Sequence, residues 1–170
     1  LVISLTSSVS PASYIYDGTA KTPTPSVSDG ATTLTSGTDY TITYTNNTNV
    51  GTATATITGT GVYNETTKSY YTGTTTVSYY INNATLTFDV GSCTSVSGST
   101  TLYTKKGATV VYTGLRETTT TGTIPTASKT GYTFQGWYTA SSNGSKVLNA
   151  NGTFSGTAVS GYTNATSWTS

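Results

Sequence analysis

Residues 129–139 read Lys-Thr-Gly-Tyr-Thr-Phe-Gln-Gly-Trp-Tyr-Thr, the densest aromatic run in the chain. Tyr132 and Phe134 are two residues apart and would point the same way from a strand, whereas Gly136 permits a bulge or turn before Trp137. Most other residues around this run are small and polar. The run therefore predicts the nucleus of a hydrophobic core, in which Tyr132, Phe134 and Trp137 are buried.

The composition of the whole chain predicts an all-β protein. Its 170 residues suffice for one domain or two small ones, and only 8% of them are charged, for a net charge of +1. Thr, Tyr, Val and Ile are typical of half-buried sheets, whereas the strong helix formers are scarce. Such weak charge carries no nucleic-acid footprint, and no apolar run reaches the ~18 residues that span a bilayer.

The first half of the chain contains a predicted β-hairpin. Tyr40, Ile42 and Tyr44 alternate with threonines, and after an Asn-rich loop a second alternating run, residues 52–58, includes Ile57. Two alternating runs joined by a short turn-forming loop are typical of antiparallel strands. These four apolar residues are the predicted core of the first half, and residues 74–81 are its predicted closing strand.

A new alternating register starts immediately after Asn82-Asn83. Leu86, Phe88 and Val90 alternate with polar residues, and Phe88 is the predicted core residue of this strand. The sequence thus divides into a first module, residues 1–82, and a second, residues 83–170. Further strands are expected at 101–103, 109–112 and 146–148, and a loop at 118–121.

Both modules resemble known families of bacterial surface proteins. The phrase GYTFQGWYT, followed by the turn at 141–144 and then Ser-Lys-Val, resembles the Listeria–Bacteroides repeat, the internalin B-repeat type of module. The first half resembles YDG/MBG-type modules in its Tyr-Asp-Gly turn at 16–18, its Asp-Tyr strand start at 39–40 and its Val-Gly-Thr-Ala strand start at 50–53. These resemblances imply an Ig-like β-sandwich followed by a β-grasp-like sheet.

The second resemblance also predicts that one strand is missing. In the modules that it resembles, a stretch like residues 161–164 leads to a further strand, for which this sequence has no matching run. The uncovered edge is expected to be filled by a continuation of the chain or by a strand from another copy, such as residues 2–6.

The sequence offers little for catalysis. It has no His, and three of its six carboxylates precede Gly or Tyr at predicted turns or strand starts. No Asp-rich loop has calcium-site spacing, and no catalytic residue, metal ligand or cofactor site is predicted. Cys93 is expected to be a plain thiol, although a thioester with Gln135 and an isopeptide bond from Lys21, Lys68 or Lys146 remain open alternatives.

Several other features have both a structural and a functional interpretation. The Thr ladders are expected to be the solvent face of a sheet rather than an ice-binding array, and the Tyr-Tyr pairs at 70–71 and 79–80 are expected to pack rather than to bind sugars. Six Asn-x-Ser/Thr sequons are present, at Asn46, Asn64, Asn83, Asn143, Asn151 and Asn164.

These observations predict a non-catalytic structural or adhesive segment of a bacterial surface or secreted protein. Its partner would be a host, glycan or cell-surface ligand, or neighbouring copies of the chain through strand donation. The alternatives are a carbohydrate-binding module, which exposed aromatic residues in a row on one face would favour, and an enzyme fragment, which two carboxylates in a cleft would favour.

Overall fold

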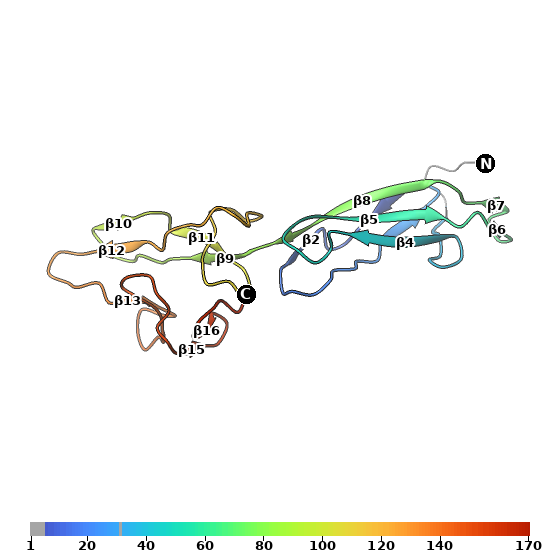
Figure 1. Ribbon diagram of the computed structural model, residues 1–170. Helices are drawn as coiled ribbons and strands as arrows, with labels where there is room; N and C mark the ends of the chain where they lie inside the picture. The colour runs from blue at the N-terminus through green and yellow to red at the C-terminus, as the bar shows by residue number, and fades with distance from the viewer. Residues whose placement is uncertain (1–5, 31) are drawn as a thin grey trace. The chain divides into compact units, whose positions relative to one another are not determined.

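The computed structural model describes residues 6–30 and 32–170 (Figure 1). Every regular element among them is a β-strand, which confirms the all-β prediction. The chain divides into two compact units. Unit 1 comprises residues 1–14 and 19–81, and unit 2 comprises residues 15–18 and 82–170. The expected opening strand and the donor segment lie, apart from Thr6, outside the described residues.

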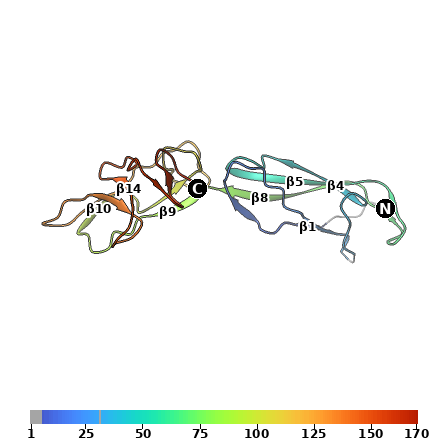
Figure 2. The ribbon, with the colours of Figure 1, turned by 90° about the horizontal axis from the view of Figure 1, so that it is seen from below.

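Unit 1 is built on a four-stranded antiparallel sheet in the order β2-β8-β5-β4 (Figure 1). Figure 2 shows β4, β5 and β8 of this sheet from below. Its strands are β2 (Ser13–Ile15), β4 (Tyr40–Thr45), β5 (Gly51–Gly59) and β8 (Thr74–Asn82). The predicted hairpin is present as β4 and β5, with Ile42 opposite Ile57. Asn46 adopts a positive φ of 55° in the Asn-rich turn, a conformation that Asn tolerates better than most residues.

A smaller ladder supplies the second layer of unit 1. β1 (Thr6–Ser8) pairs with β3 (Ser26–Ser28), and Val27 of β3 packs into one cluster with Tyr40, Ile57 and Tyr71. Alternation along β5 buries Ala53, Ala55 and Ile57 while the threonines between them face outward. The core of unit 1 therefore lies between one face of the large sheet and the small ladder.

Two tyrosines secure the proline-containing segment that precedes β3. The Tyr44 hydroxyl donates to the carbonyl oxygen of Pro23 (2.7 Å), and the Tyr79 hydroxyl donates to that of Lys21 (2.6 Å). Burial raises the pKa of both phenols above the ordinary value of 10.0. Tyr44 is half-buried, whereas Tyr79 is fully buried.

The connection between β5 and β8 folds into a small hairpin. β6 (Tyr63–Asn64) pairs with β7 (Ser69–Tyr70). Asn64 anchors it: its Nδ2 donates to Asp39 Oδ1 (2.6 Å), and its Oδ1 accepts from the N–H groups of Thr66 and Thr67. Asp39 itself is buried at the start of β4.

Unit 2 consists of short ladders of two strands each rather than one continuous sheet (Figure 1). The pairs are β9 (Ala84–Thr87) with β11 (Thr101–Thr104), β10 (Ser95–Ser97) with β12 (Thr126–Ser128), β13 (Gly136–Tyr138) with β14 (Lys146–Asn149), and β15 (Ala158–Val159) with β16 (Thr163–Asn164). Turns interrupt the chain every few residues, so no ladder extends beyond four residues.

One core joins three of these ladders, the exception being β10–β12. Its buried members are Phe88, Leu102, Val111, Val147, Leu148, Val159 and Trp168. The prediction of a strand at 109–112 is wrong, because within this stretch only Tyr112 forms β-bridges, to Tyr103 and Thr121. The last residues also enter the core: Trp168 is 3% exposed, its N–H donates to Ala108, and its carbonyl accepts from Gly107.

Candidate functional site

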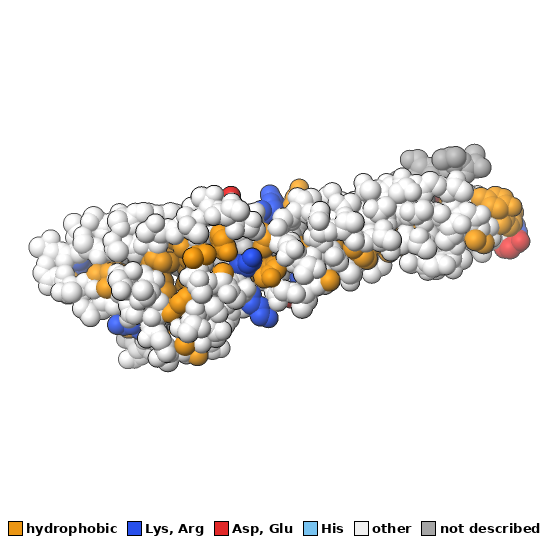
Figure 3. All heavy atoms as spheres, viewed as in Figure 1, with side chains coloured by type: hydrophobic (Ala, Val, Ile, Leu, Met, Phe, Trp, Pro, Cys, Tyr) orange, Lys and Arg blue, Asp and Glu red, His pale blue; other side chains and the backbone are white. Residues whose placement is uncertain are grey.

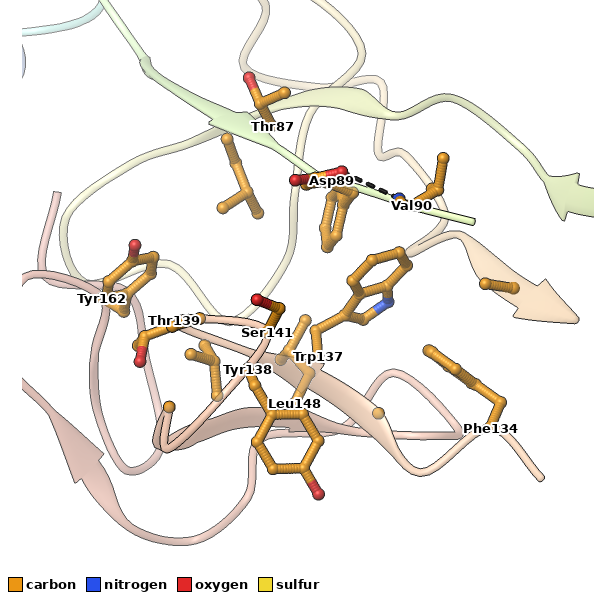
Figure 4. Close-up of a pocket in the computed structure, with 18 of the residues that line it drawn as sticks. Thr87, Asp89, Val90, Phe134, Trp137, Tyr138, Thr139, Ser141, Leu148 and Tyr162 are labelled. Carbon is orange, nitrogen blue, oxygen red and sulfur yellow. Dashed lines mark hydrogen bonds between the residues drawn. The ribbon is translucent and has the colours of Figure 1, made fainter. Parts of the chain in front are cut away.

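Unit 2 contains a groove of about 680 Å³ (Figure 4). One wall is the continuous stretch 86–93, which runs from β9 into the following turn, and the other is formed by residues 136–141, 143 and 144 around β13. The floor consists of core side chains, chiefly Val147, Leu148 and Trp168. The groove is therefore an opening into the hydrophobic core of the unit.

Trp137 is the central aromatic residue of the groove. Its ring lies 4.7 Å from that of Phe88 and 5.4 Å from that of Phe134, both in edge-on arrangements, and its Nε1 donates to the carbonyl oxygen of Pro125 (2.9 Å). It is half-buried against the core cluster. These contacts hold Trp137 as a packing residue at the groove's wall.

Local backbone chemistry explains how Trp137 reaches that position. Gly136 has a φ of 121°, and a Cβ there would collide with the carbonyl oxygen of Leu148. The glycine lets β13 approach β14 closely. The sequence suggested a bulge or turn before Trp137, but the register shifts one residue later, between Trp137 and Tyr138.

The expectation that Tyr132 belongs to the core is wrong. Residues 132–135 form no strand, and Tyr132 is 72% exposed with the Lys129 ammonium 5.0 Å from its ring centre. Its N–H donates to the Lys129 carbonyl, which closes a turn and directs the ring outward. Tyr138 also points away from the groove, beside Lys146 (Figure 4).

The other predicted core residues are distributed over both units. Tyr40, Ile57 and Phe88 are buried; Ile42, Tyr44, Phe134 and Trp137 are half-buried. The structure brings Tyr40, Ile42 and Ile57 together in the core of unit 1, and Phe88, Phe134 and Trp137 together at the groove of unit 2.

The carboxylates are used for local structure. Asp29 accepts from Tyr71 and Thr32, Asp89 accepts from the Gly91 N–H, and Glu65 pairs with Lys68 at 2.9 Å on an exposed surface. The described residues contain no group of three or more His, Cys, Asp or Glu side chains that is suited to a metal ion.

Glu117 is the most engaged carboxylate. Its Oε1 accepts from the N–H groups of residues 118, 119 and 120 and from the Thr119 hydroxyl, at 2.7–3.2 Å. These bonds stabilise the anion and lower the pKa of Glu117 from 4.5 to about 2. Glu117 thus closes its own loop through Oε1.

Asn83 is a structural residue that the sequence showed only as a sequon. It is fully buried, its Nδ2 donates to the carbonyl oxygens of Gly114 (3.2 Å) and Glu117 (2.6 Å), and its N–H donates to Leu115 (2.7 Å). Three bonds from one residue fix the loop at 114–117 against the start of β9.

Cys93 is an exposed free thiol at one end of the groove. The three lysines considered for an isopeptide bond have other partners: Lys146 lies over the ring of Tyr138, Lys68 pairs with Glu65, and Lys21 donates to Thr19.

No described helix is long and apolar enough to cross a membrane.

Comparison with known families supports the assignment of the second module. The family described as the Listeria-Bacteroides repeat domain matches residues 103–160, about a third of the chain, which confirms that resemblance for this stretch. This repeat is typical of bacterial surface proteins. The comparisons with curated proteins and with solved structures give no match.

Proposed function

We propose that this chain is a non-catalytic structural segment of a bacterial surface or secreted protein, of the kind that forms a stalk or carries an adhesive region. The observation that carries the proposal is the repeat-domain match at residues 103–160. The chain forms two compact β units, and their carboxylates accept hydrogen bonds from loops of the same unit. Both features are consistent with a load-bearing role. The partner that such a segment presents would be a host, glycan or cell-surface ligand.

The first unit fits the same proposal as a YDG/MBG-type Ig-like module. The four-stranded sheet faced by the β1–β3 ladder supports a sandwich of this kind, as does the start of β4 at the buried Asp39 and Tyr40. Tandem modules with separate cores suit a protein that spans distance rather than one that encloses a substrate.

Cell-surface labelling tests the proposal. An antibody raised against this chain is expected to bind intact cells of the source bacterium, or the secreted fraction, without permeabilisation. Labelling that appears only after the cells are lysed would contradict it. Mechanical unfolding of the chain between two marker domains tests the structural role, with two separate force peaks expected because each unit has its own core.

A second candidate function is carbohydrate binding at the β6–β7 hairpin. Tyr63 and Tyr70 lie opposite each other, with rings 5.0 Å apart and 39% and 52% exposed, and Val62 beside them is 59% exposed. Figure 3 shows these apolar side chains gathered at one end of unit 1. Exposed apolar groups clustered in this way are typical of interaction sites.

Glycan-array binding separates the two functions. If the hairpin binds sugars, Tyr63→Ala and Tyr70→Ala are expected to lower the signal at least tenfold, whereas Tyr132→Ala on the other unit leaves it unchanged. A chain that binds no glycan at high density has a structural role only.

A further inference from the structure

We propose that the groove of unit 2 accepts a β-strand from a second copy of this chain, namely its residues 1–5. This inference goes beyond the proposed function, since it concerns how copies join and not where the protein is located. It rests on the free edge of β9, the apolar floor beside that edge, and the sequence of the proposed donor.

The edge of β9 that faces away from β11 lacks a partner strand. Phe88 donates to Thr100 and Leu86 lies opposite Leu102, so alternate residues of β9 bond to β11. Thr87 lies between these bonded residues, so its N–H and C=O point away from β11. Thr101, which lies across from Thr87 in β11, uses its own N–H and C=O to bond the Ser99 hydroxyl. Within the described residues, no backbone hydrogen bond is formed by Thr85, Thr87 or Asp89 on this edge.

The groove follows this edge. Thr87 and Asp89 line it together with Leu86 and Phe88, although alternate side chains of a strand point to opposite faces. Because residues from both faces of the strand line the groove, the groove runs along the backbone edge of the strand. The other wall is β13, which pairs only with β14 among the described strands.

The floor next to the edge is apolar. Phe88, Trp137 and Leu148 present aromatic and aliphatic groups to it, and Asp89 is the one carboxylate among its lining residues (Figure 4). An edge with unpaired backbone groups beside apolar side chains is a template for strand addition. The occupant that it fits is an extended, uncharged segment with an apolar residue at every second position.

Residues 1–5, Leu-Val-Ile-Ser-Leu, have this chemistry. Four of the five are Leu, Ile or Val, more than in any other five-residue stretch, and none is charged. In an extended conformation Leu1, Ile3 and Leu5 share one face, and five residues span about 17 Å, the same length as the free edge from Thr85 to Asp89. The segment directly precedes β1, whose Thr6 is held opposite Ser28 in unit 1.

The donated strand would act in two ways. Its N–H and C=O groups pair with those of Thr85, Thr87 and Asp89, and its three apolar side chains cover Phe88, Trp137 and Leu148. Because each copy carries both a donor and a groove, the contact is head-to-tail and extends into a chain of copies.

Peptide binding tests the groove. A fluorescent peptide with the sequence of residues 1–6 is titrated into the chain that lacks residues 1–5, with fluorescence anisotropy as the readout. Saturable binding is expected, and a peptide with Ile3→Asp should bind at least tenfold more weakly. Absence of binding by the parent peptide would overturn the proposal.

A matched pair at Thr87 tests the edge itself. Thr87→Pro removes an N–H that no ladder bond uses, and proline is tolerated on the open side of an edge strand, so the fold should persist while peptide binding falls at least tenfold. Thr87→Ala keeps the N–H and should bind like the parent. Equal binding by both variants would overturn strand pairing.

The full chain tests whether the donor comes from a second copy. Analytical ultracentrifugation is expected to show concentration-dependent oligomers that Ile3→Asp abolishes. A full chain that stays monomeric, while the truncated chain binds the peptide, would mean that each copy fills its own groove and would overturn the second-copy assignment.

Cys93 provides a readout that does not depend on a folded Pro variant. It lies at the Asp89 end of the groove, so under mild oxidation Leu5→Cys should form an intermolecular disulfide if the strands are parallel, and Leu1→Cys if they are antiparallel. One variant is expected to crosslink more than the other, and excess 1–6 peptide should prevent it. Equal crosslinking that the peptide does not reduce would contradict the proposal.

Discussion

At the scale of single residues, unit 2 depends on one buried amide. Asn83 supplies three hydrogen bonds to the loop at 114–117 from a site that solvent does not reach. A carbonyl that loses its donor in such a site keeps its desolvation cost without compensation. Sequence patterns do not reveal this role, because a side-chain amide that bonds to distant carbonyls leaves no periodic signal.

Asn83→Ala is expected to destabilise unit 2 by about 2–3 kcal/mol, because it leaves the carbonyls of Gly114 and Glu117 without their donor. Urea denaturation followed by tryptophan fluorescence measures the change, since both tryptophans lie in unit 2. Ser142→Ala, an exposed control in unit 2, should change stability little. Equal effects from both variants would contradict the role given to Asn83.

Glu117 gives the protein an acid-sensitive loop. Its pKa of about 2 in the folded state lies below its ordinary value of 4.5, so its contribution to stability is complete above pH 4.5 and is lost as the pH falls toward 2. Glu117→Gln is expected to be less stable than the parent at pH 7, and this difference should shrink between pH 4.5 and pH 2. Glu65→Gln, at an exposed ion pair, serves as the control. A difference that is independent of pH would contradict the prediction.

At the scale of elements, alternation was the reliable signal. It predicted β4, β5, β8 and β9, because in each a buried face and a solvent face impose a period of two. It failed at residues 109–112 and at Tyr132, where single bridges and turns replace strands and no partner strand selects a register. The groove could not be predicted from the sequence either, because its two walls are about 50 residues apart in the chain.

Gly136 and Gly131 form a matched pair that separates close approach from backbone conformation. Both have positive φ, of 121° and 82°, but a Cβ at Gly136 would strike the Leu148 carbonyl, whereas one at Gly131 would meet nothing within 4 Å. Gly136→Ala should therefore cost on the order of 3–4 kcal/mol and Gly131→Ala about 1 kcal/mol. Thermal denaturation measures both. Equal costs would show that φ alone decides the outcome.

At the scale of the whole molecule, each unit has a core of its own. The buried cluster of unit 1 comprises Val27, Leu34, Tyr40, Ile57 and Tyr71, and none of the unit 2 core residues belongs to it. Residues 15–18 and Asn82 group with unit 2, and these are the two departures from the division into residues 1–82 and 83–170.

Residues 1–82 expressed alone are expected to fold cooperatively, because this fragment retains the entire cluster and all of the ladders of unit 1. Circular dichroism during urea denaturation should show one sigmoidal transition. A fragment that is unfolded in buffer, while the whole chain is folded, would show that unit 1 needs residues beyond 82.

The sparse charge of the four-stranded sheet also determines how the protein is degraded. None of its strands contains Lys or Arg, and between Lys21 and Lys105 the chain carries a single basic residue, Lys68. Proteases that cut after basic residues would therefore find almost no cleavage point in unit 1 even when it opens. The chain also has no methionine and only one cysteine for oxidants to attack. Resistance of unit 1 to proteases of this specificity, and of the chain to oxidation at sulfur, is thus built into the covalent chain and outlasts any transient loss of the fold.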